Sequence, residues 1–281
     1  MAAKHALKVG SRFVPLVTSN DKVHLQQVSE FKPLLAWAKN LAKEEEASSQ
    51  RQSSSTTHDD KATKNDDAAT GPPVTVLKVE VKSVEYFGPR LGFVNLAVDA
   101  KLTESGQKPP GLVFMRGGAV AVLLILKSTG PSGEVSEHVV LTKQPRLSIP
   151  SFNFPEIPAG MLDGSGDFVG KCAEELKEEC GITLDHNSLI DMTELAYGSK
   201  WDGVYPSAGG CDEFLRLFVC CKDMEWNELQ ALEGRLGGLR DNGESISLAL
   251  VALKDAYKTA PDAKLLSSLA LFNALKADGK L

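Results

Sequence analysis

Apolar residues recur along the chain with two periods, which predict a mixture of strands and helices. A β-rich stretch that begins at Val74 is expected to pair antiparallel with the segment 91–102, with Gly88-Pro89 in the turn between them. Continuous or alternating apolar runs bounded by turn residues predict strands in the rest of the chain. These further strands are expected at Ala119–Lys127, His138–Gln144, Asp191–Tyr197, Glu213–Cys221 and Ser245–Leu253.

Helices are predicted where apolar residues lie three and four positions apart. A short amphipathic helix is expected from Phe31 to Leu41, with Ser29 as its cap. Further helices are expected at Asp167–Cys180, at Glu225–Glu233 and after Pro261-Asp262 near the C-terminus. Because strands and helices do not alternate regularly, the pattern predicts an α+β fold and not a βαβ repeat.

Residues 44–70 divide the chain, because no apolar residue in this stretch is larger than Ala. Such a segment cannot bury enough surface to offset its ordering entropy, so a disordered linker is predicted at 44–73. The expected organisation is therefore an N-terminal segment with a short helix at 1–43, the linker, a β-rich region at 74–110 and a larger domain at 111–281.

Composition narrows the class of protein. The chain has 31 Lys and Arg against 37 Asp and Glu, a net charge of −6, which argues against a nucleic-acid binder. The sequence contains no run of about 18 apolar residues, so no membrane span is predicted. Five Cys without metal-ligand spacing suggest buried thiols in a reducing compartment. We expect a cytoplasmic protein; the alternative is an organelle, because Lys4, Lys8 and Arg12 precede the first acid, Asp21.

Three carboxylates are expected to share one side of the helix at 167–180. Glu175, Glu178 and Glu179 have i, i+3 and i+4 spacing, and like charges at that spacing destabilise a helix unless a cation lies between them. Oxygen ligands favour Mg²⁺ or Mn²⁺. The alternative is a solvated acidic helix face.

The segment 156–182, EIPAGMLDGSGDFVGKCAEELKEECGI, resembles the signature of the Nudix hydrolases. That signature is Gly, five residues, Glu, seven residues, Arg-Glu, an apolar residue, any residue, Glu-Glu, any residue, Gly and an apolar residue. Two positions differ, because Gly166 replaces the first Glu and Glu174 replaces the Arg. The matching residues are Gly160, Glu175, Leu176, Glu178, Glu179, Gly181 and Ile182.

The resemblance extends to the nucleotide-sugar branch of the family, the ADP-sugar diphosphatases of plants and their fungal relatives. It implies a Nudix fold, with a mixed β-sheet sandwiched between helices at 111–281. It also implies that the β-rich region at 74–110 packs against a partner in a homodimer. The segments that carry it are YFGPRLGFVNL (86–96), PGLVFMRGGAVAVLLIL (110–126), TKQPR (142–146), EIPAGMLD (156–163), YPSAGGCDE (205–213), GLRDNGES (238–245) and DAKLLSSLAL (262–271).

The resemblance also implies a metal site and a base. Glu175, Glu179 and the carbonyl of Ala159 are expected to bind Mg²⁺, with Mn²⁺ as an alternative. Glu178 is expected to be a catalytic residue that binds metal or orients the attacking water. Glu244 matches a carboxylate on a distant loop that acts as general base or as a further metal ligand.

Substrate-binding residues follow from the same resemblance. Arg116 and Arg146 match arginines that contact the substrate, and their forked guanidinium groups suit a phosphate or a sugar. The alternative for each is a surface salt bridge. Glu213 matches a residue beside the substrate. Phe87, with Tyr86, could supply an aromatic face for adenine or belong to the core.

The resemblance therefore implies Mg²⁺-dependent hydrolysis of an ADP-sugar, ADP-glucose or ADP-ribose, to AMP and a sugar 1-phosphate. The alternatives are a UDP-sugar diphosphatase and a Nudix-fold protein that binds nucleotide sugars without efficient hydrolysis. The substitutions at 166 and 174 motivate the last reading. Either Glu174 alters the geometry of the site, or Lys171 or Lys177 compensates for its charge.

Overall fold

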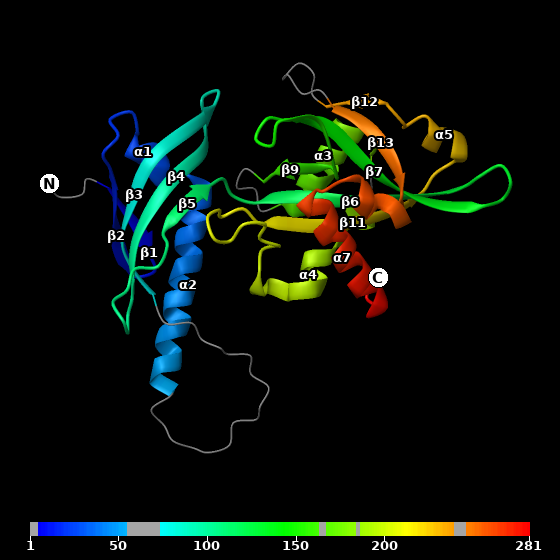
Figure 1. Cartoon of the computed structure of the whole chain (residues 1–281). Helices are drawn as coiled ribbons and strands as arrows, with labels where there is room; N and C mark the ends of the chain where they lie inside the picture. Colours follow the sequence, from blue (N-terminus) through cyan, green and yellow to red (C-terminus); the bar gives the residue numbers. More distant parts are fainter. Residues whose placement is uncertain (1–4, 55–73, 163–166, 184–185, 239–245) are drawn as a thin grey trace. The chain divides into compact units, whose positions relative to one another are not determined.

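The computed structural model describes residues 5–54, 74–162, 167–183, 186–238 and 246–281 (Figure 1). The chain divides into two compact units, and each is described by itself. The first unit comprises Met1–Gly117 with Ser207–Asp212, and the second comprises Gly118–Pro206 with Glu213–Leu281. Among the described residues, no helix is both long and apolar enough to cross a membrane.

The first unit is built on a five-stranded sheet in the order β1-β2-β3-β4-β5. Strands β1 and β2 pair antiparallel, as do β3 and β4, whereas β2 and β3 are parallel. Gly88 connects β3 to β4 with a φ of 59°, a left-handed conformation that Gly adopts readily, so the expected turn is confirmed. The strands are β1 His5–Val9, β2 Arg12–Thr18, β3 Val74–Phe87, β4 Arg90–Leu102 and β5 Leu112–Met115.

Residues before 44 belong to the same sheet as the β-rich region, which corrects the expected division at 1–43 and 74–110. Leu16 in β2 is the register partner of Val79 in β3, and both side chains are fully buried. The pairing joins segments more than 60 positions apart, which a local pattern does not show. The N-terminal segment is therefore part of a single folded unit.

Two helices, α1 Leu25–Ser29 and α2 Lys32–Ser54, belong to this unit. Apolar side chains of both, such as Val28 and Leu34, share the buried core of the sheet. The expected cap at Ser29 is wrong, because its hydroxyl donates to the carbonyl of Gln26 at the end of α1.

Helix α2 also corrects the predicted start of the linker at 44. The Glu, Ala, Gln and Arg residues after 43 have high helix propensity, so the helix continues to Ser54 without an apolar face of its own. Arg12 in β2 donates from Nε to Glu45 at 3.0 Å, which ties this part of α2 to the sheet. Residues 55–73, the rest of the predicted linker, lie outside the described residues.

The second unit contains an eight-stranded mixed sheet. Its main path is β10-β11-β6-β7-β13-β12, and β8 and β9 pair with β7 and β6. Only the β11–β6 pair among these described strands is parallel. The strands are β6 Ala119–Thr129, β7 Val135–Arg146, β8 Ser151–Glu156, β9 Ala159–Met161, β10 Ile190–Asp191, β11 Leu215–Asp223, β12 Leu236–Gly237 and β13 Ile246–Ala252.

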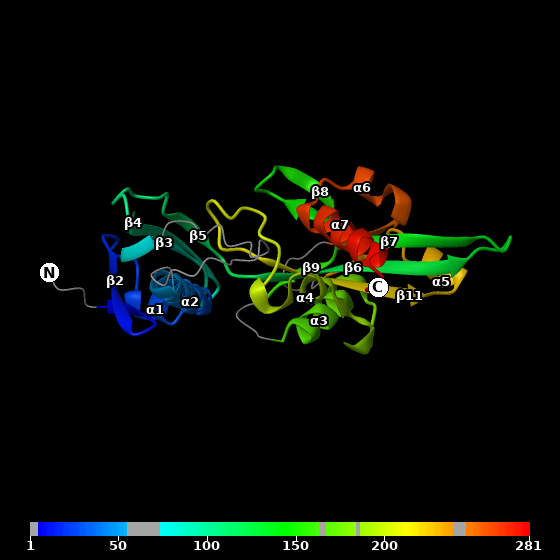
Figure 2. The same cartoon turned by 90° about the horizontal axis from the view of Figure 1, so that it is seen from below.

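Helices cover both faces of this sheet, as Figure 2 shows for α3 and α7. Alternate residues of β6 enter two cores: Leu123 packs with residues of α7, and Leu124 packs with residues of α3. The predicted α+β architecture, a mixed sheet between helices, is confirmed. The helices are α3 Phe168–Cys180, α4 Met192–Tyr197, α5 Trp226–Gln230, α6 Ala256–Thr259 and α7 Ala263–Ala277, with 3-10 turns at His186–Ser188, Gly198–Lys200 and Leu253–Asp255.

The strand predicted at Asp191–Tyr197 is wrong beyond its first residue. Asp191 ends β10, and its side chain accepts the backbone N–H of Glu194 at 2.8 Å. An Asp in this position is a strong N-cap, so Met192–Tyr197 forms α4. The predicted helix at Glu225–Glu233 is shorter, Trp226–Gln230.

Candidate active site

Helix α3 carries the predicted metal-binding carboxylates, and both of its ends are fixed by local chemistry. Asp167 caps the helix by accepting the backbone N–H of Gly170 at 2.8 Å. Gly181 ends it with a φ of 64°, and Ile182 is buried just beyond. Gly181 and Ile182, the last glycine and the last apolar position of the Nudix signature, therefore terminate the helix that carries its acids.

Strand β9, which precedes α3, lies against two of these acids. It pairs antiparallel with β6, which fixes Ala159 and Gly160 opposite Ala121 and Val120. The backbone N–H of Ala159 donates to Oε2 of Glu179 at 3.2 Å, and Glu179 is only 6% exposed. A Cβ on Gly160 would lie 1.9 Å from Oε1 of Glu175. The structure thus brings Ala159, Glu175 and Glu179 together, and only Gly leaves room for the Glu175 carboxylate.

Lys171 supplies a positive charge to this group. Its Nζ lies 2.8 Å from Oε1 of Glu175 and 2.9 Å from Oε2 of Glu174. Burial opposes the charge of Lys171, but its hydrogen bonds to Glu175 and Glu174 raise its pKa overall. Burial raises the pKa of Glu175, while Lys171 partly offsets that effect. Of the two lysines considered for charge compensation, Lys171 is the one that contacts Glu174.

Glu178 lies near the same group. Its negative charge contributes to the raised pKa of Glu175. Its backbone carbonyl accepts the N–H of Gly238 at 3.0 Å, and a Cβ on Gly237 would lie 1.9 Å from the carbonyl oxygen of Glu179. Gly237 and Gly238 therefore lie beside the C-terminal end of α3. Glu244, the expected base, and Gly166 lie outside the described residues.

The side-chain chemistry at α3 fits a hard divalent cation. Glu175 and Glu179 offer carboxylate oxygens, and Gly160 leaves a cradle that a Cβ would fill. An ammonium group, that of Lys171, already contacts Glu175. Within the described part of the chain, however, no three His, Cys, Asp or Glu side chains converge as a group able to hold a metal. A complete site would need ligands beyond Glu175 and Glu179, such as the carbonyl of Ala159, water or substrate.

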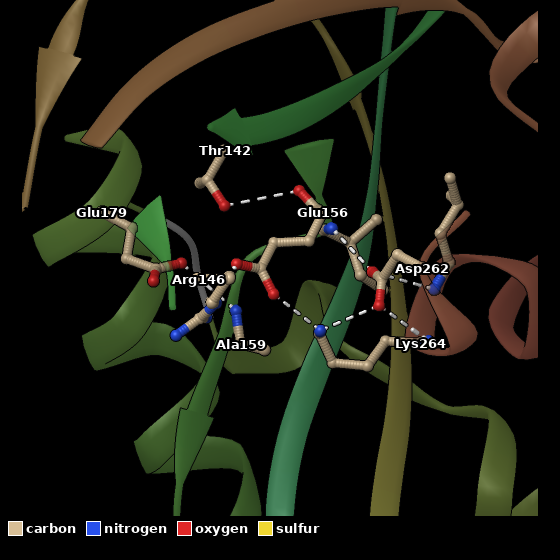
Figure 3. A network of polar contacts seen from close by, with 9 residues as sticks. Thr142, Arg146, Glu156, Ala159, Glu179, Asp262 and Lys264 are labelled. Atoms are coloured by element: carbon tan, nitrogen blue, oxygen red, sulfur yellow. Dashed lines mark hydrogen bonds and ion pairs between the residues drawn. The ribbon is translucent and has the colours of Figure 1, made fainter. Parts of the chain in front are cut away.

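Arg146 lies in a second polar network, shown in Figure 3. Its Nε donates to Oε1 of Glu156 at 2.7 Å, and Oε2 of Glu156 accepts from Nζ of Lys264 at 2.8 Å. The side chain of Arg146 is 41% exposed, whereas that of Glu156 is 3% exposed. The expected substrate arginine therefore forms an ion pair with Glu156 through Nε, while its side chain remains partly exposed.

The other predicted substrate residues are divided between the two units. Arg116 and Phe87 belong to the first unit, where both contact Phe93. The Arg116 guanidinium carbon lies 5.7 Å from the centre of the Phe93 ring. The ring centres of Phe87 and Phe93 are 4.8 Å apart, and their planes make an angle of 85°. Tyr86 donates its hydroxyl to Gln27 at 2.6 Å. Glu213 belongs to the second unit and is half-buried.

Sequence reasoning missed three polar residues. Asp212 accepts the backbone N–H of Arg116 at 2.7 Å. Burial raises the pKa of Asp212, and N–H donation by Arg116 and Gly117 offsets this only in part. Glu156 and Lys264 were not assigned roles, although both lie in segments that carry the family resemblance. The sequence signal for Glu156 and Lys264 is a charged residue next to apolar residues, since a buried charge needs a partner.

Comparison with known proteins bears on this site. No protein-family model matches the chain. Nudix hydrolase 14, chloroplastic, from Arabidopsis thaliana is 38% identical over 207 residues, which are 73% of this chain and 65% of the relative. A solved structure titled "Crystal structure of ADP compounds hydrolase" matches with a TM-score of 0.47 and 16% identity, over 74% of this chain and 97% of that one.

The similarity to the Arabidopsis protein confirms the family resemblance. Identity of 38% over 207 residues makes the chain a homologue of this Nudix hydrolase. The chain spans 65% of the length of that relative.

Proposed function

We propose that the protein is a divalent-cation-dependent Nudix hydrolase that cleaves the diphosphate of an ADP-sugar to AMP and the corresponding sugar phosphate. The observation that carries the proposal is the placement of Glu175 and Glu179 beside Ala159 and Gly160 of β9, in a homologue of a Nudix hydrolase. ADP-glucose and ADP-ribose are the proposed substrates, on the sequence resemblance to the nucleotide-sugar branch.

Glu175, Glu179 and the carbonyl of Ala159 would hold Mg²⁺ or Mn²⁺. A bound divalent ion neutralises the charge of the diphosphate oxygens and acidifies water. Glu179 is buried and already oriented by the Ala159 N–H, so little reorganisation of its carboxylate is needed on binding.

The remaining steps use other side chains. Glu178 is proposed to orient the attacking water or to serve as a further ligand, from its position next to Glu179. Glu244 is proposed as the base that removes a proton from this water, or as another ligand. Arg146 and Arg116 are proposed to bind substrate oxygens, with Glu213 and Phe87 as further substrate contacts.

The test is a substrate panel on the full chain. Purified protein is incubated with ADP-glucose, ADP-ribose or UDP-glucose in Mg²⁺, in Mn²⁺ and in EDTA, and the released nucleotide and sugar phosphate are identified. The expected result is AMP with glucose 1-phosphate from ADP-glucose, or AMP with ribose 5-phosphate from ADP-ribose, and no release in EDTA. UMP from UDP-glucose alone would favour the UDP-sugar alternative. Tight ADP-sugar binding without AMP release in either metal would identify a binding protein instead.

A homodimer is also proposed, through the β-rich region that now includes β1 to β5. Its support is the sequence resemblance, together with large apolar side chains at the surface of this unit, such as Leu112 at 73% exposed and Phe13 at 66%. Light scattering coupled to size-exclusion chromatography should give twice the chain mass of 30.2 kDa. A mass of one chain at micromolar concentration would reject the dimer.

We propose a cytoplasmic location, with an organelle as the alternative. The Arabidopsis relative is described as chloroplastic, which supports the alternative. Imaging of the chain with a fluorescent protein at its C-terminus would distinguish the two.

A further inference from the structure

The network around Glu156 joins three segments of the second unit (Figure 3). Arg146 is the last residue of β7, Glu156 is the last residue of β8, and Asp262 and Lys264 begin α7. Lys264 donates to Asp262 at 2.9 Å as well as to Glu156. Two acids and two bases thus balance each other, which is the condition under which buried charges are tolerated.

The Glu156 carboxylate is held in place from several sides. Thr142 donates its hydroxyl to the backbone carbonyl of Glu156 at 3.3 Å. The next backbone N–H, that of Ile157, donates to Oδ2 of Asp262 at 3.2 Å. Because the backbone and the side chain of Glu156 are both held by these contacts, the position of its carboxylate determines where the Arg146 guanidinium lies.

The way in which Arg146 contacts Glu156 determines what its guanidinium can still bind. Only Nε is engaged by the carboxylate. In the described part of the chain, the Nη1 and Nη2 groups have no hydrogen-bond partner, and the side chain is 41% exposed. The guanidinium group is planar, so a hydrogen bond at Nε restricts its orientation and leaves the two terminal amino groups as a fork, the geometry that recognises paired phosphate oxygens.

We propose that Glu156 is a positioning residue that orients Arg146 toward the diphosphate of the substrate. This inference rests on the proposed function. Lys264 and Asp262 hold Glu156, and Glu156 holds Nε of Arg146, so the long arginine side chain is ordered before the substrate arrives. Ordering a flexible side chain in advance removes part of the entropy loss on binding.

The first experiment tests the hold on Arg146 without using activity. In the ¹⁵N-labelled full chain, the variant Arg146→Lys identifies the Nε–H signal of Arg146 by its disappearance. The variant Glu156→Gln has one acceptor and one donor in place of two acceptors, so Arg146 and Lys264 cannot both be satisfied. Exchange of the Arg146 Nε–H with water should then accelerate by roughly tenfold or more. An unchanged exchange rate would overturn the positioning role, whatever the substrate.

The second experiment tests the consequence for substrate binding. For ADP-glucose in Mg²⁺, Glu156→Gln should raise KM roughly tenfold, with kcat changed by less than about threefold. In an Arg146→Met background, Glu156→Gln should raise KM no further, because it acts through Arg146. A further rise of similar size in that background would overturn the proposal.

Leu275→Ala controls for loss of stability. Leu275 is 3% exposed and lies in the same helix as Lys264, about 20 Å from Asp262 along the helix axis. This variant should lower the unfolding temperature and leave KM unchanged; an equal rise in KM would attribute the effect of Glu156→Gln to destabilisation. If the wild type releases no nucleotide from any sugar diphosphate, the proposed function fails, and with it the substrate role of Arg146. An unchanged KM in an active Glu156→Gln enzyme would reject this inference alone.

Discussion

Two acidic clusters in the second unit differ in how their charge is balanced. At α3, the segment 171–179 contains four Glu and two Lys, and Lys171 is shared between Glu174 and Glu175. At the start of α7, Glu156 and Asp262 are matched by Arg146 and Lys264. The first cluster has surplus negative charge, and the second has none.

The difference indicates what each cluster can do. The surplus carboxylates at α3 repel one another, and burial raises the pKa of Glu175. A bound divalent cation would reduce this electrostatic repulsion. A balanced, buried network gains nothing from a further cation and instead holds its members in fixed positions. The α3 cluster therefore suits metal binding, and the Glu156 network suits support of a neighbouring group.

The largest expected effect tests the α3 cluster. Glu179→Gln should lower hydrolysis by at least about 100-fold at saturating Mg²⁺, because it removes a charged ligand from the proposed site. The amide oxygen can still accept the Ala159 N–H, so the unfolding temperature in EDTA should change little. Near-normal turnover of this variant would refute the site.

The second prediction tests the balanced network through its stability. Asp262→Ala removes the partner of Lys264, of the Ile157 N–H and of the first N–H groups of α7, so unfolding free energy should fall by about 3 kcal/mol. Asp167→Ala, which removes the exposed cap of α3, is the matched control and should lower it by only about 1 kcal/mol. Chemical denaturation measures both, and equal losses would contradict the distinction between the two clusters.

The third prediction concerns the space that the α3 cluster needs. Gly160→Ala places a methyl group where Oε1 of Glu175 lies, so the carboxylate must move. Because small displacements of a catalytic group are costly, kcat/KM should fall by roughly 10- to 100-fold, and the Mg²⁺ concentration for half-maximal rate should rise. A Mg²⁺ titration of the rate, with unfolding temperature as the check on folding, decides this. Wild-type behaviour would show that Glu175 is not needed in this position.

The smallest expected effect concerns Glu174, which is 54% exposed. Glu174→Arg should raise the hydrolysis rate by roughly two- to fivefold, because it removes surplus negative charge and adds a cation, with exposure limiting the size. Glu174→Gln, which only removes charge, should lie between this variant and the wild type. Rates are compared across a metal titration, and an unchanged or lower rate for Glu174→Arg would contradict the prediction.

The helical part of the site could be predicted because its information is local. Spacing of the acids, the Asp167 cap and the Gly181 terminus all lie within 15 residues, so the pattern alone predicted α3 almost to its ends. The error at Asp191–Tyr197 is also local in origin, because the capping Asp191 outweighs the short apolar pattern that predicts a strand.

The partners of the charged residues could not be predicted in this way. Glu156 and Lys264 are 108 positions apart, and no spacing rule joins them. Arg146 was expected to face the substrate, and its contact with Glu156 depends on the β7–β8 pairing. Likewise, the N-terminal strands join β3 through long-range pairing, so the first unit was divided wrongly at 44.

The order of residues along the chain was thus enough for the resemblance to the Nudix hydrolases, the α+β class and the acids on α3, because a helix brings i, i+3 and i+4 positions together by its own geometry. Tertiary structure decided which charges meet: Lys171 with Glu174 and Glu175, and Arg146 with Glu156. It also decided that Gly160 must lack a side chain. These contacts depend on the packing of distant strands and helices, which sets position and burial and, through them, the electrostatic environment of each group.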